Sequence, residues 1–116
     1  MKEAEVPTTM SLNEVGRAAL AHTKKAGFLD KKRPAAPHIH MLIVTEIAEA
    51  TEEVRNGRPS WYHENGKPEG ECIELADALI RILEHAAWNG WDMEAAVRAK
   101  MTYNKGRGYR HGGKTS

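Results

Sequence analysis

The stretch from Glu69 to Trp88 constrains the fold most, because its apolar side chains cover most of a helix rather than one face. At about 100° per residue, its apolar residues point in several directions around the axis. They are Ile73, Leu75, Ala76, Leu79, Ile80, Ile82, Leu83 and Ala86. A helix of this kind is buried on more than one side. In a chain of 116 residues, we therefore expect it at a central position or at a subunit interface.

Three further helices are predicted, ending near Ala26, Gly57 and Lys105. Ser11 and Glu14 have the spacing of a capping box, and Asp92 is expected to cap the last helix. The second helix starts near Pro37 and carries one apolar stripe, formed by Ile39, Ile43, Ile47, Ala50 and Val54. No strand is predicted, and residues 58–68 are expected to form a loop, in which packing of Trp61 and Tyr62 against the core is favoured over stacking on a nucleotide base.

Four helices with short connections predict an all-α fold, an antiparallel four-helix bundle that is oligomeric. We expect a loose N-terminal arm over residues 1–10, the helical domain over 11–108 and a flexible basic tail over 109–116. The apolar third helix favours a homodimer or a homotetramer over a monomer.

Composition excludes several classes of protein. Cys72 is the single cysteine, so a disulfide framework is excluded and a reducing, cytoplasmic location is expected. No apolar run approaches the roughly 20 residues of a membrane span. A net charge of +1 argues against a stable nucleic-acid partner. Charge is nevertheless segregated: nine acids face three bases between Glu46 and Asp77, and six bases and no acid follow Glu94.

Two carboxylate pairs are the main candidate site. Glu46 and Glu49 are three residues apart on the second predicted helix, and Glu74 and Asp77 repeat that spacing on the third. Such pairs are commonly solvated surface. Carboxylates in the most apolar helix would be expensive without compensation, however, and a bound Mg²⁺ is the simplest one, with Mn²⁺ as a substitute. A di-iron site is disfavoured because no histidine has an acid three residues before it.

A basic face on the last helix is the expected counterpart. Lys100, Asn104 and Arg107 follow one another at helical spacing and are candidates for binding phosphates. A basic last turn that complements the helix dipole explains Arg107 equally well. Arg110 and Lys114, in a glycine-containing tail, are either part of a flap over a phosphate or part of a disordered end.

These residues together resemble the signature of the MazG-like all-α nucleoside triphosphate pyrophosphohydrolases. The resemblance consists of the two carboxylate pairs separated by 24 residues, the Gly66–Gly70 stretch, and Lys100-x-x-Tyr103-Asn104-x-x-Arg107 with the His111–Lys114 stretch after it. It covers roughly residues 12–114, and it is greatest to the short, single-domain members of bacteria and phages.

The resemblance implies Mg²⁺-dependent hydrolysis of (deoxy)nucleoside triphosphates to monophosphate and pyrophosphate. It implies metal binding by the four paired carboxylates and nucleotide contacts by Lys100, Asn104 and Arg107. On chemical grounds, Glu49 or Glu53 is the candidate that orients or deprotonates the attacking water. Two alternatives stay open: a non-enzymatic helical dimer that binds a polyanion or a protein, and an enzyme acting on phosphoribosyl-ATP.

Overall fold

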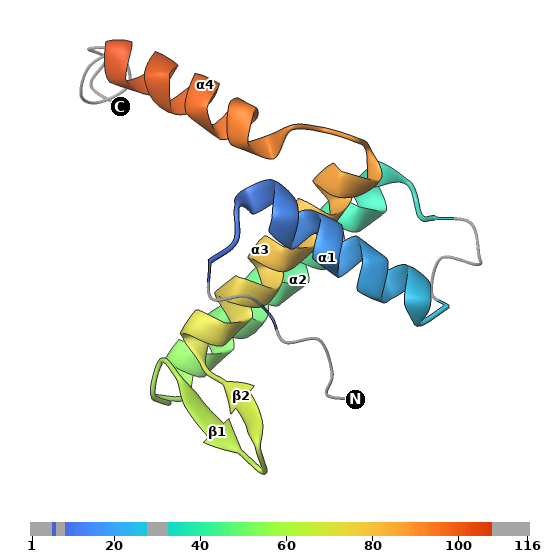
Figure 1. Cartoon of the computed structure of the whole chain (residues 1–116). Coiled ribbons are helices and arrows are strands. Elements are labelled where there is room, and N and C mark those ends of the chain that lie inside the picture. Colours follow the sequence, from blue (N-terminus) through green and yellow to red (C-terminus); the bar gives the residue numbers. More distant parts are fainter. Residues whose placement is uncertain (1–5, 7–8, 28–32, 108–116) are drawn as a thin grey trace.

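The computed structural model describes residue 6, residues 9–27 and residues 33–107, and it is mostly helical (Figure 1). The elements, in chain order, are α1 (Leu12–Lys25), α2 (Ala36–Arg55), β1 (Tyr62–Glu64), β2 (Lys67–Glu69), α3 (Glu71–Trp88) and α4 (Met93–Gly106). None of the helices described is long and apolar enough to cross a membrane.

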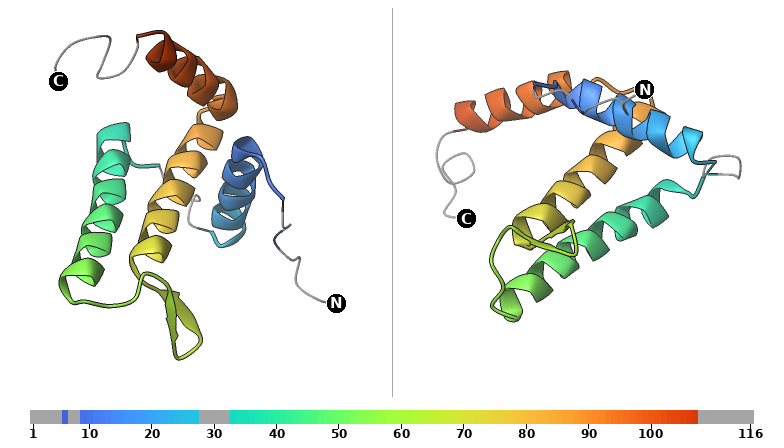
Figure 2. Two further views of the ribbon diagram at one scale, coloured as in Figure 1. Left: turned by 90° about the vertical axis from the view of Figure 1, so that its left-hand side faces the viewer. Right: turned by 60° about the horizontal axis from the view of Figure 1, so that its bottom comes forward.

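The helix α3 lies at the centre of the fold, with α2 along one side and α1 along the other (Figure 2). Its buried residues are Ala78, Leu83 and Ala86. The expectation of a central, apolar third helix is therefore confirmed. The capping box of Ser11 and Glu14 is also present, and it starts α1 where the sequence predicts.

Gly16 sets the distance between α1 and α3. A Cβ atom added at Gly16 would lie 2.3 Å from the carbonyl oxygen of Leu83 and 3.4 Å from the Cβ of Ala87. The two backbones can approach this closely only because residue 16 has no side chain. Gly16 is the buried residue of α1.

We therefore expect Gly16→Ala to lower the free energy of unfolding by about 1–3 kcal/mol, the usual cost of overpacking a core. Gly106→Ala is the matched control, because nothing lies within 4 Å of a Cβ at that helical position. Urea denaturation of both variants checks the prediction. Equal stability of Gly16→Ala and the wild type would contradict the close approach of α1 and α3.

The segment between α2 and α3 forms a β-hairpin, so the prediction of an irregular loop without strands is wrong there. β1 and β2 pair antiparallel, with Tyr62 opposite Glu69 and Glu64 opposite Lys67. Asn65 and Gly66 join them with φ angles of 55° and 82°, the positive values of a type I′ turn. Strands of three residues are too short to show alternation, but the Asn-Gly pair was an available signal for this hairpin.

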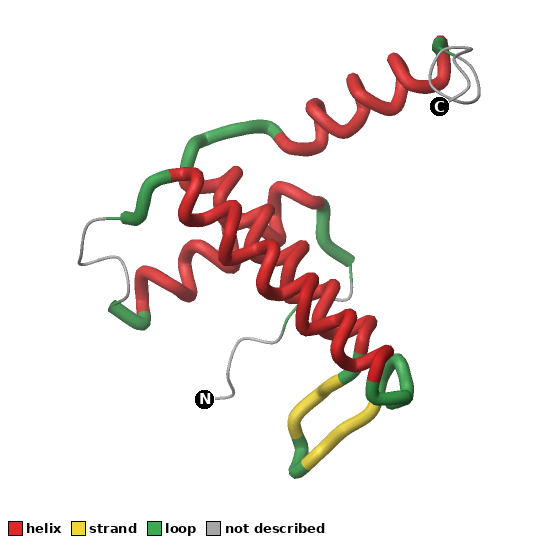
Figure 3. Tube along the Cα trace, turned by 180° about the vertical axis from the view of Figure 1, so that it is seen from behind, coloured by secondary structure: helices red, strands yellow, loops and turns green. Residues whose placement is uncertain are grey.

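The helix α4 leaves the body of the molecule, so the prediction of an antiparallel bundle of four helices is only partly correct. It contacts α1 near its own first turn and then projects outward (Figure 3), and none of its residues is buried against the described part of the chain. Its start is fixed by hydrogen bonds: the backbone N–H of Leu12 donates to Glu94 at 2.9 Å, and that of Met93 donates to Asn13 at 2.9 Å. The side-chain amide of Asn13 also donates to Asp92 at 2.9 Å.

Much apolar surface stays exposed in the single chain. The expected stripe of α2 is correct for Ile39 and Ala50, which are buried, but wrong for Ile47 and Val54, which are 45% and 55% exposed. The Cα radius of gyration is 17.0 Å, against roughly 13 Å for a compact chain of this length. The described chain is thus more extended than a self-contained domain of its size.

His85 is half-buried at the end of α3 distant from the hairpin. Its ring makes edge contacts with His40 and Trp91, at centroid distances of 5.8 and 5.6 Å. Its Nδ1 atom is buried and has no hydrogen-bond partner among the described residues. Burial lowers the pKa of His85, and the charges of Arg33 and His40 lower it further.

A lowered pKa in the folded state makes His85 a source of acid sensitivity. Above the ordinary pKa of 6.5, His85 is neutral in both the folded and the unfolded chain. As the pH falls through that value, the unfolded chain takes up a proton that the folded chain resists, so stability is lost. We expect His85→Asn to reduce the loss of unfolding free energy between about pH 7.5 and about pH 5.5, as measured by urea denaturation. His63→Asn, at an exposed hairpin position, should keep the wild-type loss; equal losses in both variants would argue against this role of His85.

Candidate metal centre and adjoining groove

Glu46 is the buried charged side chain among the described residues, with 8% of its surface exposed. It lies on the side of α2 that packs against α3. Its Oε2 atom accepts a hydrogen bond of 2.8 Å from Nε of Arg81, which lies on α3. The charge of Glu46 is thus compensated within the chain by one guanidinium group.

The start of α3 is fixed by Gly70, whose φ of 116° is in the region that only glycine adopts readily. A Cβ at Gly70 would lie 2.3 Å from the carbonyl oxygen of Ser60, which instead accepts a hydrogen bond from the backbone N–H of Cys72 at 2.9 Å. The carbonyl of Gly70 accepts from the N–H of Glu74 at 2.9 Å. The hairpin therefore determines where α3 begins, and so where the carboxylate of Glu74 lies.

The paired carboxylates of α2 and α3 converge. Glu46, Glu74 and Asp77 each offer one oxygen atom, and these three atoms lie within 4.8 Å of one another. Glu74 is half-buried and Asp77 is exposed, so the cluster opens to solvent at Asp77. Glu49 is outside this triad, and its negative charge is among those that raise the pKa of Glu74.

Electrostatics in the cluster disfavours four negative charges. Burial raises the pKa of Glu74, and repulsion by Glu49, Asp77 and Glu46 raises it further. One guanidinium, that of Arg81, is paired with this group of carboxylates among the described residues. A divalent cation held between α2 and α3 would relieve the repulsion.

The donor set fits a hard divalent cation. Three carboxylate oxygens within 4.8 Å, with a fourth carboxylate beside them, suit the oxygen coordination that Mg²⁺ and Mn²⁺ prefer. The open side at Asp77 leaves room for water and for phosphate oxygens, which Mg²⁺ usually keeps as ligands.

Glu53, the alternative candidate catalytic base, lies elsewhere. Its Oε1 atom accepts a hydrogen bond of 2.8 Å from the hydroxyl of Tyr62, and its Oε2 atom is 3.6 Å from the guanidinium of Arg58. Tyr62 thus ties the hairpin to the end of α2, as predicted for a packing aromatic. Trp61 is 62% exposed and does not pack as predicted.

The candidate phosphate-binding residues lie on α4. Lys100 and Arg107 lie over the ring of Tyr103, each 5.3 Å from its centroid, and Asn104 is exposed on the same helix. The structure does not bring them to the carboxylates of their own chain, because α4 projects outward from α1. Arg110 and Lys114, together with the tail over residues 109–116, lie outside the described residues, as does most of the arm over residues 1–10.

A groove of about 450 Å³ adjoins the carboxylate cluster, and sequence reasoning missed it. Asp77 belongs to both the cluster and the groove. The lining residues come from α1, α2, α3 and the segment before α2: His22, Thr23, Arg33, Pro34, Ile39, Leu42, Asp77, Ile80, Arg81 and Glu84. The available signal was the position of Arg81, one helical turn after Asp77 on α3. The groove offers apolar contacts and two guanidinium groups beside acidic oxygens.

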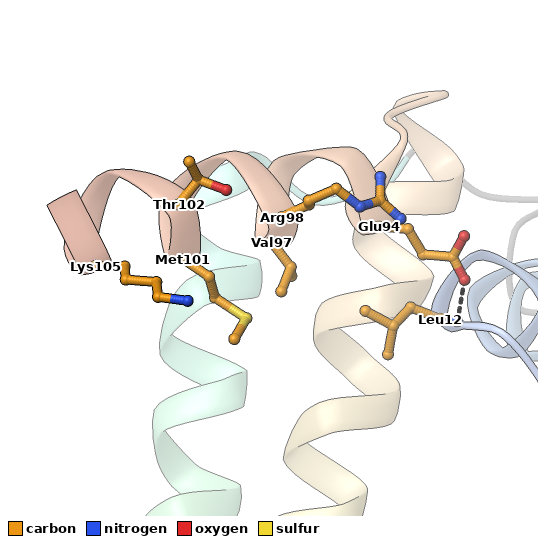
Figure 4. Close-up of a pocket in the computed structure, with 7 residues that line it drawn as sticks. All are labelled: Leu12, Glu94, Val97, Arg98, Met101, Thr102 and Lys105. Atoms are coloured by element: carbon orange, nitrogen blue, oxygen red, sulfur yellow. Dashed lines mark hydrogen bonds between the residues drawn. The ribbon is translucent and has the colours of Figure 1, made fainter.

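A second groove, of about 640 Å³, lies between the start of α1 and α4. Val97 and Met101 of α4 point into the same space as Leu12 of α1 (Figure 4). Arg98 and Lys105 also line this groove, and Met101 is 66% exposed. The chain therefore carries an apolar strip on α4 as well as the basic face.

Comparisons with known proteins gave no family model, no curated protein and no solved structure that matches this chain. The functional argument therefore rests on the residues and on their arrangement.

Proposed function

We propose that this protein is a Mg²⁺-dependent pyrophosphohydrolase of (deoxy)nucleoside triphosphates, of the MazG-like type that its motifs resemble. The observation that carries the proposal is the convergence of Glu46, Glu74 and Asp77 from two helices, with oxygen atoms within 4.8 Å. Sequence spacing predicted each pair on one helical face, and the packing of α2 on α3 brings Glu46 together with Glu74 and Asp77. A groove with guanidinium groups beside the cluster supports an anionic substrate.

In the proposed chemistry, different carboxylates bind the cation and position the attacking water. Bound Mg²⁺ would supply Lewis-acid polarisation of the phosphoryl oxygens and charge neutralisation, and Mn²⁺ would substitute for it. Glu46, Glu74 and Asp77 would hold the cation. Glu49, which is exposed beside Glu74, orients the water for attack at the α-phosphorus. We assign this role to Glu49 rather than Glu53, because Glu53 is engaged by Tyr62 and Arg58.

The same proposal includes a homodimer, or a homotetramer built from it. Leu75, Leu79 and Ile82 share one face of α3 and are 44%, 48% and 37% exposed, which is costly in a lone chain. α4 carries the strip of Val97 and Met101 outward, and its basic face lies away from the carboxylates of its own chain. In the proposed dimer, α4 of one protomer supplies Lys100 and Arg107 to the carboxylate cluster of the partner.

Asp77→Asn should lower Mg²⁺-dependent pyrophosphate release by roughly a hundredfold or more, because a carboxylate ligand is lost at the open side of the cluster. The assay is a panel of nucleoside triphosphates scored for pyrophosphate against orthophosphate. The control is Glu52→Gln, since Glu52 pairs with Arg55 at 2.6 Å and is not part of the cluster.

Full activity of Asp77→Asn would remove Asp77 from the metal site. A wild-type protein that releases no pyrophosphate, and whose melting temperature does not respond to Mg²⁺ with a non-hydrolysable triphosphate, would support the non-enzymatic alternative. That alternative is a helical dimer whose exposed basic face on α4 binds a polyanion or a protein. Activity on phosphoribosyl-ATP alone would support the second enzymatic alternative.

Mixing two inactive variants tests the composite site. Asp77→Asn and Lys100→Ala chains, unfolded together and refolded at equal amounts, should recover about a quarter of the wild-type activity, because half of the dimers are mixed and each of these has one complete site. Each variant refolded alone is the control. No recovery, in a mixture that size-exclusion chromatography shows to be dimeric, would mean that α4 does not serve the partner's carboxylates.

A further inference from the structure

The carboxylate cluster has a cationic partner that neither the sequence motifs nor the proposed mechanism uses. Nε of Arg81 donates to Oε2 of Glu46 at 2.8 Å. Glu46 is also one of the three residues whose oxygens are within 4.8 Å of one another. A guanidinium and a cation at this cluster would therefore compete for the same carboxylate.

The position of Arg81 on α3 allows it to serve two sites. It follows Asp77 by four residues and Glu74 by seven, so the three side chains share one face of the helix. Its side chain is 45% exposed, while the carboxylate side chain that it contacts is 11% exposed. The carboxylate of the pair thus lies within the helix packing, and the guanidinium side chain reaches solvent.

Arg81 also lines the groove of about 450 Å³, together with Asp77 and Arg33. Arg33 lies with its guanidinium carbon 4.8 Å from the centroid of the Trp88 ring. The groove's apolar wall is formed by Ile39, Leu42 and Ile80. A guanidinium that lines such a groove, next to acidic oxygens, is suited to phosphate oxygens, which guanidinium groups often bind through two N–H groups at once.

We propose that Arg81 is a switching counter-ion: it holds Glu46 in the metal-free protein and transfers to a phosphate oxygen of the substrate in the groove when a divalent cation binds. This inference rests on the proposed function and adds a phosphate-binding residue that does not come from α4. The exchange keeps the charge of the site balanced in both states, since the cation replaces Arg81 on Glu46 and the phosphate replaces Glu46 on Arg81.

The exchange predicts opposite effects of one substitution on two ligands. Arg81→Gln removes the competitor for Glu46, so the affinity for Mn²⁺ alone should rise by roughly three- to tenfold. The affinity for a non-hydrolysable, imido-bridged triphosphate in the presence of Mg²⁺ should fall by roughly tenfold or more, because a charge-assisted contact is lost. Both affinities are measured by titration calorimetry, and Mn²⁺ binding also by electron paramagnetic resonance.

Two matched variants complete the experiment. Arg55→Gln removes a guanidinium from another ion pair, that with Glu52 at 2.6 Å, and should change neither affinity. Arg81→Lys keeps the charge and should keep Mn²⁺ affinity near the wild-type value while recovering part of the triphosphate affinity. Circular dichroism of each variant checks that the helices are retained.

The failure of this inference is distinct from the failure of the proposed function. If the wild type binds Mn²⁺, Asp77→Asn does not, and Arg81→Gln leaves both affinities unchanged, the metal centre stands and the switch is wrong. If Arg81→Gln weakens Mn²⁺ binding, Arg81 supports the site by positioning Glu46, which also overturns the switch. If the wild type binds neither Mn²⁺ nor the triphosphate, the proposed function fails and the inference fails with it.

Discussion

The candidate site depends on one constraint: the packing of α2 against α3 brings carboxylates close together, where their negative charges repel one another. Glu46 is buried, Glu74 is half-buried with a raised pKa, and the two lie with Asp77 inside a small volume. Helix packing elsewhere stabilises this arrangement: Gly16 lets α1 approach α3, and Gly70 fixes the first turn of α3 against the hairpin. A cluster held in this way is preorganised for a cation, because the free energy of folding, and not that of cation binding, brings the like charges together.

Hydrogen bonds at the start of α4 decide in which direction this helix leaves α3. A short connection after α3 would allow α4 to fold back on the bundle, but Asn13 binds both Asp92 and the N–H of Met93. These bonds, with that between Glu94 and the N–H of Leu12, direct α4 away from α2 and α3. The result is a helix whose apolar strip and basic face are both exposed. Because most helical stability in proteins comes from tertiary packing, the proposed dimer would supply the packing surface that α4 lacks among the described residues.

Local signals predicted the four helices of this fold, and they did not predict the hairpin or the direction of α4. Ser11, Asp92 and Gly27 marked helix ends because capping is a property of a few adjacent residues. The hairpin was missed because its strands have three residues each and are too short for an alternating pattern, and the hydrogen bond from Tyr62 to Glu53 that ties it to α2 is not visible in either segment alone. The direction of α4 could not be predicted, since Asn13 and Asp92 are 79 residues apart in the chain.

The candidate site, too, was predicted from the sequence only in part. Spacing along one helix predicted each carboxylate pair, and the convergence of the pairs needed only that α2 and α3 be neighbours. Arg81 was not predicted, because nothing in its own helix indicates that it pairs with Glu46, 35 residues earlier. A motif of acidic residues predicts the ligands of a cation, but it does not predict which group compensates their negative charge when no cation is bound. In this chain the guanidinium of Arg81 pairs with Glu46 and lines the adjoining groove, and in the proposed exchange the same group would bind a phosphate oxygen.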